Sequence, residues 1–443
     1  GVSPARLEAI RRRMKEGQLN VLRELLPDRV IHEACAQMGH AYRERLLPPI
    51  VMVFHYLYAA LWPEDSFQAA AAAGGLAVGS GSLSKARQRL PRGVIEHLGR
   101  YTSALGQSLS EGLAQMHGFR LVSLDGTCVS MEDVPELWKE FGTADTRHGP
   151  GKYPEARLVV ASLVKTGVVL DHRLGSYRTS EHALGLDLLI SLRPGDLLLA
   201  DAHFAGSNLY FRYLEHGVQF ITPVHQRLKV ERLRRTRQDP DGSFVAEVPI
   251  WPSHRKKYPF LPRTMLLRFV PVRLRSRVGR PLSYLVTSLL DAERYGGEVI
   301  RDLYRMRWPI EPEFNELKHP LSADVLRSKT VDSIYKEVTA KVMAMNLLRC
   351  LMLQAAQRYG REPDRLSFAH TRRSAVAYSL RMSAAPISRL LDLYDELLAE
   401  IARVWVVRRP GRIEPRALRR ETKHYDRLKT TRREWRLRHG LVA

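Results

Sequence analysis

The chain has 443 residues, of which 70 are Lys or Arg and 47 are Asp or Glu, giving a formal net charge of +23 at pH 7. Such a surplus excludes few roles but favours a polyanionic partner, most often nucleic acid, over an acidic or neutral one. A ribosome-associated or merely basic protein would have the same balance. The length allows two or three domains with sizeable cores.

The cysteines and the apolar runs of the sequence indicate in which cellular compartment the protein is expected. Three widely separated cysteines fit neither a disulfide framework nor a paired-cysteine zinc site, which favours a reducing cytosol. No signal-peptide pattern is evident at the start of the sequence. The longest apolar run, 46–61, is interrupted by Pro48, Pro49 and His55, so we expect a buried helix and no membrane association.

Residues 1 to about 115 are predicted to be helical, because apolar residues recur there at helical spacing. Within this region, 66–73 predicts a short helix, the glycines between 74 and 81 a turn, and 82–90 a basic helix that includes Lys85 and Arg87. This order is compatible with a helix-turn-helix that contacts DNA, although many helical hairpins share it.

From about residue 118 the pattern becomes that of strands. Strands are predicted over 119–131, 157–164, 168–177, 196–200 and 219–224, with helices over 181–192 and 207–215. Three hairpin-like strands followed by alternating helix and strand predict an α/β fold with a mixed sheet.

The rest of the chain changes character twice. Residues 226 to about 280 are basic and contain short strand-like pieces at 244–250 and 264–272, which indicates a β-rich insertion. An apolar strand over 282–290 then precedes a long helical region that starts near 297, and 331–353 predicts another helix. The tail from Arg408 is dense in Arg and Lys, which is typical of a solvated arm. Its aromatic residues suggest ordering on DNA.

Two acids stand where predicted strands end or turn. Asp125 interrupts the apolar run 121–127, and Asp201 follows the run 197–200. A carboxylate within an apolar strand is costly unless it is paired or binds a cation. A single strand-end acid is more often part of a turn, but two of them with a third acid downstream suggest a metal site.

The third acid lies in a spaced motif. Tyr304, Arg307, Glu311 and Lys318 are separated by three, four and seven residues, which places them on one stripe of a straight helix. A carboxylate among cations suits a site that holds metal ions against phosphates, and three carboxylates can hold two Mg²⁺ for phosphodiester cleavage. The other acids that compete for these roles are Glu132, Asp133, Asp171, Glu313 and Glu316.

With these residues the chain resembles bacterial insertion-sequence transposases of the DDE class, in the family marked by a Tyr-x2-Arg-x3-Glu-x6-Lys signature. The four spaced residues match that signature, and residues 287–291, 303–308 and 326–329 match the family's sequence around it. The resemblance covers roughly 120–349. It implies a ribonuclease-H-like catalytic core over 116–225 and 282–355, interrupted by the β-rich insertion at 226–281. A helical end-recognition domain over 1–115 and a helical, basic C-terminal region over 356–443, for DNA binding or dimerisation, would complete the chain.

The resemblance also implies roles for single residues. Asp125, Asp201 and Glu311 would form the catalytic triad that binds Mg²⁺, with Mn²⁺ able to substitute. Trp251 would either stack on a flipped base near the cut or pack in the core of the insertion. The remaining DNA contacts are expected from Tyr304, Arg307, Lys318, His203, Lys85, Arg87, Arg327, Lys329, Arg419 and Arg420.

Two departures from the family pattern have structural consequences. Relatives often have Arg directly after the second Asp, where this chain has Ala202 and His203. Pro309 and Pro312 flank Glu311, and proline inside a helix removes a hydrogen bond and clashes with the preceding turn. We therefore expect a helix break near Trp308, with the acid in the first turn of a new helix.

The implied activity is cut-and-paste DNA transposition in the bacterial cytoplasm, on nucleoid DNA. The protein would bind the terminal inverted repeats of its own element and pair two ends in a homodimer. It would use water to free a 3′-OH that then attacks target DNA. The alternatives are a domesticated DNA-binding protein that has lost cleavage, and a structure-directed metal nuclease on the same fold.

Overall fold

The structure, a computed structural model, describes residues 20–43, 46–62, 66–69, 78–146, 149–225, 227–272, 283–307, 325–406, 434 and 437–438. Residues up to Val406 form one compact unit and residues from Val407 a second. The four-part division expected from the sequence is finer and stays a prediction. In the described ranges no helix is both long and apolar enough to cross a membrane.

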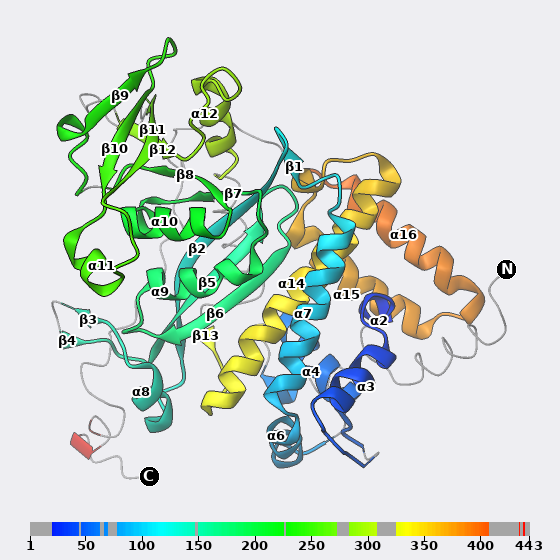
Figure 1. Cartoon of the computed structure of the whole chain (residues 1–443). Helices are drawn as coiled ribbons and strands as arrows, with labels where there is room; N and C mark the ends of the chain where they lie inside the picture. The colour runs from blue at the N-terminus through cyan, green and yellow to red at the C-terminus, as the bar shows by residue number, and fades with distance from the viewer. Residues whose placement is uncertain are drawn as a thin grey trace. The chain divides into compact units, whose positions relative to one another are not determined.

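The first unit begins with helices, continues with the strands of the sheet and the helices between them, and ends with helices (Figure 1). The strands are β1 (Gln115–Met116), β2 (Phe119–Met131), β3 (Asp145–Thr146), β4 (Gly149–Pro150), β5 (Glu155–Leu163), β6 (Val169–Ser176), β7 (Asp196–Ala200), β8 (Gln219–Pro223), β9 (Arg234–Gln238), β10 (Phe244–Pro249), β11 (Thr264–Val272), β12 (Ser283–Thr287) and β13 (Val325–Leu326). The α-helices are α2 (Asn20–Leu25), α3 (Asp28–Gln37), α4 (Pro49–Leu61), α6 (Ser80–Arg89), α7 (Arg92–Leu109), α8 (Pro135–Phe141), α9 (Glu181–Asp187), α10 (Ser207–Glu215), α11 (Pro252–Lys257), α12 (Gly297–Arg305), α14 (Val331–Tyr359), α15 (Phe368–Ala384) and α16 (Leu390–Arg403). Short 3₁₀ turns lie at η1 (Leu189–Ser191), η2 (Ala202–Phe204), η3 (Val230–Arg232), η4 (Pro363–Arg365) and η5 (Ile387–Arg389).

A mixed sheet forms the centre of this unit. Its first part has the order β6-β5-β2-β7-β8. Strand β5 runs antiparallel to both of its neighbours, β2 and β6, whereas β7 and β8 run parallel to β2. The antiparallel strands can follow one another by tight turns, while the parallel strands need helical crossovers, here α9 and α10. This is the strand order of a ribonuclease-H-like core, and the predicted mixed sheet is confirmed.

The predicted β-rich insertion continues the same sheet. Beyond β8 the order is β12-β11-β10-β9, and all four neighbouring pairs are antiparallel. Strand β11 is where the sequence predicted it, and β9 forms the outer edge, with every side chain exposed and three of five residues arginine. The insertion therefore lengthens the core sheet in the described residues.

The two faces of the sheet are covered by different helices. Leu121 of β2 and Leu197 of β7 pack with Ile300 and Leu303 of α12 in one core. Residues of the opposite register, such as Leu124 of β2, pack with α9 and α10 in a second core. Because side chains alternate between faces along a strand, each strand contributes to both cores.

A third core joins the N-terminal and C-terminal helices to the end of the sheet. Helix α14 begins where Thr330 accepts a hydrogen bond from the Ser333 N–H, and it ends at Gly360, whose φ of 60° is the left-handed conformation that glycine favours. It is buried along most of its length and packs against α4, α7, α15 and α16. Figure 1 shows α7 and α14 side by side along the sheet.

The N-terminal elements fit the helical prediction. The apolar run at 46–61 forms the buried helix α4, which starts at Pro49, as proline at a first helical position allows. The basic helix of the predicted helix-turn-helix is α6, which starts at Ser80, two residues earlier than expected. Residues 67–69 are helical, and 70–77 lie outside the described residues, so the motif stays a prediction.

Candidate active site

Asp125 and Asp201 are neighbours on adjacent parallel strands. Strands β2 and β7 pair in register from Arg120 opposite Asp196 to Leu124 opposite Ala200. The two acids are the next residue after the last paired residues of these neighbouring strands, whose backbones lie roughly 4.8 Å apart. The structure thus brings together two carboxylates that the sequence only placed at separate strand ends.

Both carboxylates are on the face of the sheet that α12 covers. Asp125 is in the same alternating register as Leu121, and Asp201 continues the register of Leu199; both leucines pack in the core with α12. Further along this face of β2, Val129 belongs to the core that contains α14. The two acids therefore lie where the α12 core meets the α14 core.

Local hydrogen bonds orient each acid. Asp125 accepts a hydrogen bond from the Gly126 N–H (2.9 Å), and Asp201 accepts one from the His203 N–H (2.8 Å), which begins the turn η2. Both residues are partly buried.

Two half-buried carboxylates at this spacing repel one another unless a cation lies between them. Their hard oxygen atoms are the ligands that divalent ions such as Mg²⁺ prefer. Within the described part of the chain, no three His, Cys, Asp or Glu side chains are placed to hold a metal ion. The pair fits a divalent ion, and a third ligand would come from elsewhere in the chain.

The competing acid Asp171 has other partners. It lies on β6, which β5 separates from β2. Its carboxylate accepts hydrogen bonds from Arg173 Nη1 (2.6 Å) and Ser191 Oγ (2.7 Å). Burial tends to raise the pKa of Asp171, but these bonds and the arginine charge outweigh it, so the pKa lies below its usual value. Asp171 is thus an ionised, paired carboxylate away from the site.

Glu181, which the sequence marked only as a helix start, approaches β2 from the opposite face. A Cβ at Gly126 would lie 2.8 Å from the Glu181 carboxylate, so the end of this side chain lies directly against the strand and would have to move for any larger residue. Gly126 faces the side opposite to Asp125, and Glu181 forms an ion pair with Arg157 at 2.9 Å. Of the other competitors, Asp133 accepts a hydrogen bond from Trp138 and Glu132 is exposed, whereas 313 and 316 lie outside the described residues.

Helix α12 presents the first signature residue beside this face. Tyr304 packs against the α12 core, and the Arg307 guanidinium lies 5.7 Å from its ring centroid. The helix ends at Arg305, before Arg307, so the four signature residues do not share one straight helix, as the expected break implies. The expected break near Trp308 comes slightly early. Proline at 309 disfavours helical conformation at the residue before it, which favours an early end.

The chain returns to β2 directly after this motif. Strand β13 pairs in parallel with Ser130 and Met131 of β2. Because β5 occupies one edge of β2, β13 lies on the edge that β7 occupies earlier. Glu311 and Lys318 lie in 308–324, outside the described residues. The residues before that segment pack on the face that carries Asp125, and those after it pair with the same strand.

Two histidines that the sequence reasoning missed lie close to His203, two residues after Asp201. His182 of α9 contacts the His203 carbonyl through Nε2. Burial lowers the pKa of His225, and the positive charge of Arg227 and the nearby His182 and His203 lower it further. No motif marks these histidines; they converge because α9, η2 and the end of β8 meet at the carboxyl ends of the strands.

Trp251 lies between β10 and α11 and is 46% exposed. This exposure does not fit the alternative interpretation of Trp251 as a core residue of the insertion. The stacking role stays a prediction.

The predicted DNA contacts on α6 differ from each other. Lys85 is exposed. Arg87 is partly buried, with its guanidinium 3.5 Å from the Phe67 ring centroid and Nη2 donating to Ser328 Oγ at 2.8 Å. Arg87 therefore joins α6 to the loop that follows β13, and its contact with DNA stays a prediction.

That loop contains two further predicted contacts. The backbone N–H groups of Arg327 and Ser328 donate to the buried carboxylate of Glu337 at 3.1 and 2.9 Å. Lys329 is exposed next to them. Arg419 and Arg420 lie outside the described residues.

The family model described as "Transposase DDE domain" matches residues 117–347, more than half of the chain. The chain belongs to the DDE transposase family. It is therefore a DNA transposase, an enzyme class that cleaves and joins DNA strands with divalent metal ions, and an inactive DNA-binding protein is not favoured.

Two curated transposases are similar to this DDE transposase. It is 24% identical over 347 residues to the transposase InsG for insertion sequence element IS4 of Escherichia coli strain K12, with 77% of each chain covered. It is 26% identical over 155 residues to the putative transposase InsZ of the same organism, which covers 34% of this chain and 52% of that one. Among solved structures, the cryo-EM piggyBac transposase synaptic complex with hairpin DNA is similar with a TM-score of 0.44 and 11% identity, over 89% of this chain and 86% of that chain.

Proposed function

We propose that this DDE transposase excises its own insertion sequence by cut-and-paste transposition, with Asp125, Asp201 and Glu311 as the metal-binding triad. The observation that carries the proposal is the placement of the two aspartates side by side on the α12 face of the sheet. Glu311 follows α12 by a few residues, and the chain then returns to β2 at β13. Glu311 thus lies in the chain between α12, which packs on the face that carries Asp125, and β13, which pairs with the same strand β2. A segment between these two elements is suited to supply the third carboxylate.

The division of labour follows from charge. The carboxylates hold divalent ions, for which we propose Mg²⁺, with Mn²⁺ as a substitute. When bound, such ions would activate the attacking water or 3′-OH and stabilise the leaving oxygen. Tyr304 and Arg307 would orient phosphates at the cut end through a hydroxyl and a charge-assisted donor, with Lys318 as a further cation.

The remaining assignments extend this proposal to the whole chain. The helical region before β1 would recognise the terminal inverted repeats, and the basic C-terminal region would bind DNA or a second copy of the chain. Two ends would be paired in a homodimer, on nucleoid DNA of the bacterial cytoplasm. The surplus of 23 positive charges supports an extended surface that contacts DNA phosphates.

The test is cleavage of a duplex that carries the DNA flanking this gene, with Mg²⁺ and with Mn²⁺. We expect cuts at the element boundaries, followed by a strand-transfer product when target DNA is added. Glu311→Gln should bind the same duplex and not cut it, whereas the matched control Glu316→Gln should cut.

Other results would overturn parts of the proposal. Cutting by Glu311→Gln and not by Glu316→Gln would reassign the third acid. Cuts that ignore the boundaries, without strand transfer, would indicate a structure-directed nuclease. Tight binding without cutting by the wild-type protein would indicate a domesticated DNA-binding protein.

A further inference from the structure

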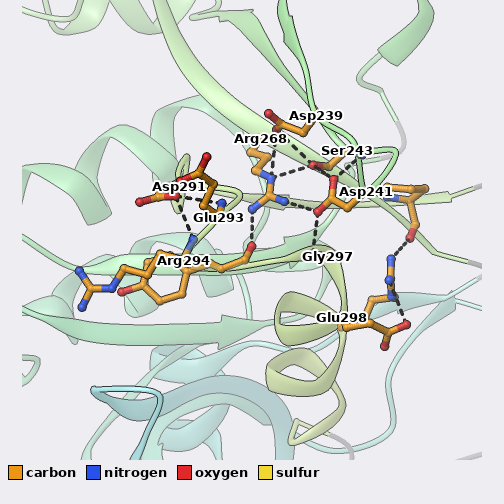
Figure 2. Close-up of polar contacts among 12 residues, drawn as sticks. Asp239, Asp241, Ser243, Arg268, Asp291, Glu293, Arg294, Gly297 and Glu298 are labelled. Carbon is orange, nitrogen blue, oxygen red and sulfur yellow. Dashed lines mark hydrogen bonds and ion pairs between the residues drawn. The ribbon is translucent and has the colours of Figure 1, made fainter.

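A buried arginine in the insertion is linked to the start of the signature helix α12. Arg268 of β11 is fully buried (0% exposed). Its Nη2 donates to Asp241 at 2.6 Å, Nε to Ser243 Oγ at 2.8 Å, and Nη1 to the Tyr295 carbonyl at 2.5 Å (Figure 2). A buried guanidinium is costly unless its donors are paired, and here each nitrogen has a partner.

Asp241 connects this arginine to the helix. It lies in the turn between β9 and β10, where Gly242 has a φ of 82°. One carboxylate oxygen accepts from both Arg268 and the Gly297 N–H, the latter at 2.7 Å, and the other accepts from the backbone and side chain of Ser243 at 2.9 and 2.5 Å. The carboxylate is therefore held by the insertion on one side and by α12 on the other.

The first turn of α12 has no cap of its own. Gly296, its N-cap residue, has no side chain to accept a hydrogen bond, and Gly297 is the first helical residue. Asp241 supplies the missing acceptor from the insertion, at the end of the helix where a negative charge is favourable. Arg268 holds the carbonyl of Tyr295 just before the cap, so the entry to α12 is held on both sides of Gly296.

The charges and the packing around this contact match. Partial burial tends to raise the pKa of Asp241, but the hydrogen bonds from Ser243 and Gly297 and the charge of Arg268 outweigh it, so the pKa lies below its usual value. A Cβ at Gly297 would lie 3.0 Å from an Asp241 oxygen, so a larger residue there would push the carboxylate away by a few tenths of an ångström. Arg301 in the next turn donates to the Pro271 carbonyl of β11 at 3.1 Å.

The helix transmits this fixed start to the signature residues. Tyr304 lies two turns, about 10 Å, from Gly297 along α12, and the face between them is buried through Ile300 and Leu303. A short helix that is held at its first turn and packed along one face moves as a unit. Displacement of its N-terminus therefore displaces Tyr304 and the chain that leads to Glu311.

We propose that Asp241, held by Arg268, is a positioning residue for DNA cleavage, through which the insertion sets the position of α12 and of the signature residues. This inference rests on the proposed roles of Tyr304, Arg307 and Glu311. It assigns to the insertion a function inside the protein, separate from any contact that it makes with DNA.

The test compares Asp241→Ala with Asp241→Asn, which retains an acceptor for the Gly297 N–H, and with Gly297→Ala, which disturbs the contact from the helix side. The matched control is Asp196→Ala. Asp196 also accepts from an arginine (Arg120, 2.6 Å) and from a backbone N–H (Arg193, 2.8 Å), but at the far end of β7 from Asp201.

Two readouts separate positioning from stability. The first is the single-turnover cleavage rate on a duplex that carries the flanking DNA, at saturating protein, together with the affinity for that duplex. The second is hydrogen exchange of the α12 amides in the protein alone. Melting temperatures of all variants report the loss of stability.

We expect Asp241→Ala to slow cleavage by about ten- to a hundred-fold, because small misplacements of reacting groups have effects of this size. Its affinity should stay within about three-fold, and its α12 amides should exchange faster. Gly297→Ala should act in the same direction, Asp241→Asn should be milder, and Asp196→Ala should lose stability without either effect.

The proposal is overturned if Asp241→Ala is folded and has wild-type cleavage and α12 exchange. It is also overturned if its loss of activity equals that of Asp196→Ala at the same loss of stability. If Asp241→Ala does not fold, Gly297→Ala and Asp241→Asn decide on the same readouts. A wild-type protein that does not cleave, with α12 exchange that still depends on Asp241, would refute the proposed function and leave the helix contact standing.

Discussion

Asp201 holds the N–H of His203 while its neighbour Asp125 holds the N–H of Gly126, so each acid has a structural bond besides its proposed ligand role. These two roles can be separated at Asp201. Its carboxylate begins the turn η2 through one oxygen, which an asparagine would also offer, whereas the negative charge belongs to the carboxylate alone.

We therefore predict that Asp201→Asn and Asp201→Ala lose cleavage equally but differ in stability. Cleavage should fall by more than about a hundred-fold in both, since even the partners of metal ligands are worth ten- to a hundred-fold. Asp201→Ala should lose about 1 kcal/mol more in the free energy of unfolding, as for a lost helix cap. Single-turnover cleavage and urea unfolding measure the two effects, and a cutting Asp201→Asn would contradict the triad.

The two basic residues of α6 should behave differently. Arg87 lies over Phe67 and bonds Ser328, so Arg87→Ala should lower the free energy of unfolding by about 2 kcal/mol. The exposed Lys85 makes no such contact with the part of the chain that the structure describes, and Lys85→Ala should change stability by less than about 0.5 kcal/mol.

If Lys85 contacts a phosphate, Lys85→Ala should also reduce the salt dependence of DNA binding by about one unit of slope. Affinity measured over a range of salt concentrations tests this. An unchanged slope with unchanged affinity would remove Lys85 from the DNA-contact set and weaken the helix-turn-helix prediction.

Trp251 should affect DNA and not folding. Because its side chain is 46% exposed, Trp251→Ala should leave the free energy of unfolding within about 0.5 kcal/mol. If it stacks on a base near the cut, the variant should lose about 1–3 kcal/mol of interaction with that base. Fluorescence of 2-aminopurine near the end, compared with the exposed-aromatic control Phe260→Ala, reports the stacking. Equal signals for both variants would contradict the prediction.

His55 should make the helical region acid-sensitive. It is fully buried, and neither ring nitrogen has a hydrogen-bond partner among the described residues. Burial, and to a lesser degree the nearby Arg87, lower the pKa of His55 to about 4. The unfolded chain binds this proton below about pH 6.5, whereas the folded chain binds it only near pH 4.

Stability contributed by the neutral histidine is therefore complete above pH 6.5 and is lost as the pH falls towards 4, by at most roughly 3 kcal/mol. Urea unfolding of the wild type and His55→Leu between pH 7 and 4.5 tests this. The variant should show a smaller loss on acidification, and parallel pH profiles would contradict the prediction.

The sequence by itself determined the elements whose signals are local. The apolar alternation around Asp125 and the short run before Asp201 correctly predicted β2 and β7, and three hairpin-like strands before the helices predicted the mixed sheet. These features depend on a period of two or 3.6 residues and on nearby turn residues, which a single window of sequence contains. The spaced signature also identified the family before any contact was known.

Only the tertiary structure decided which residues distant in sequence lie close together in space. Asp125 and Glu181 lie on opposite faces of the sheet, and His182 and His225 converge at one end of it. The contact of Asp241 with Arg268 and Gly297 likewise joins segments that are far apart in the chain. Nothing in the local pattern at Asp241 distinguishes a turn acid from the cap of a distant helix. That distinction arises because strand pairing and burial place one carboxylate between a buried guanidinium and an open helix end, and such pairing is set by the whole chain.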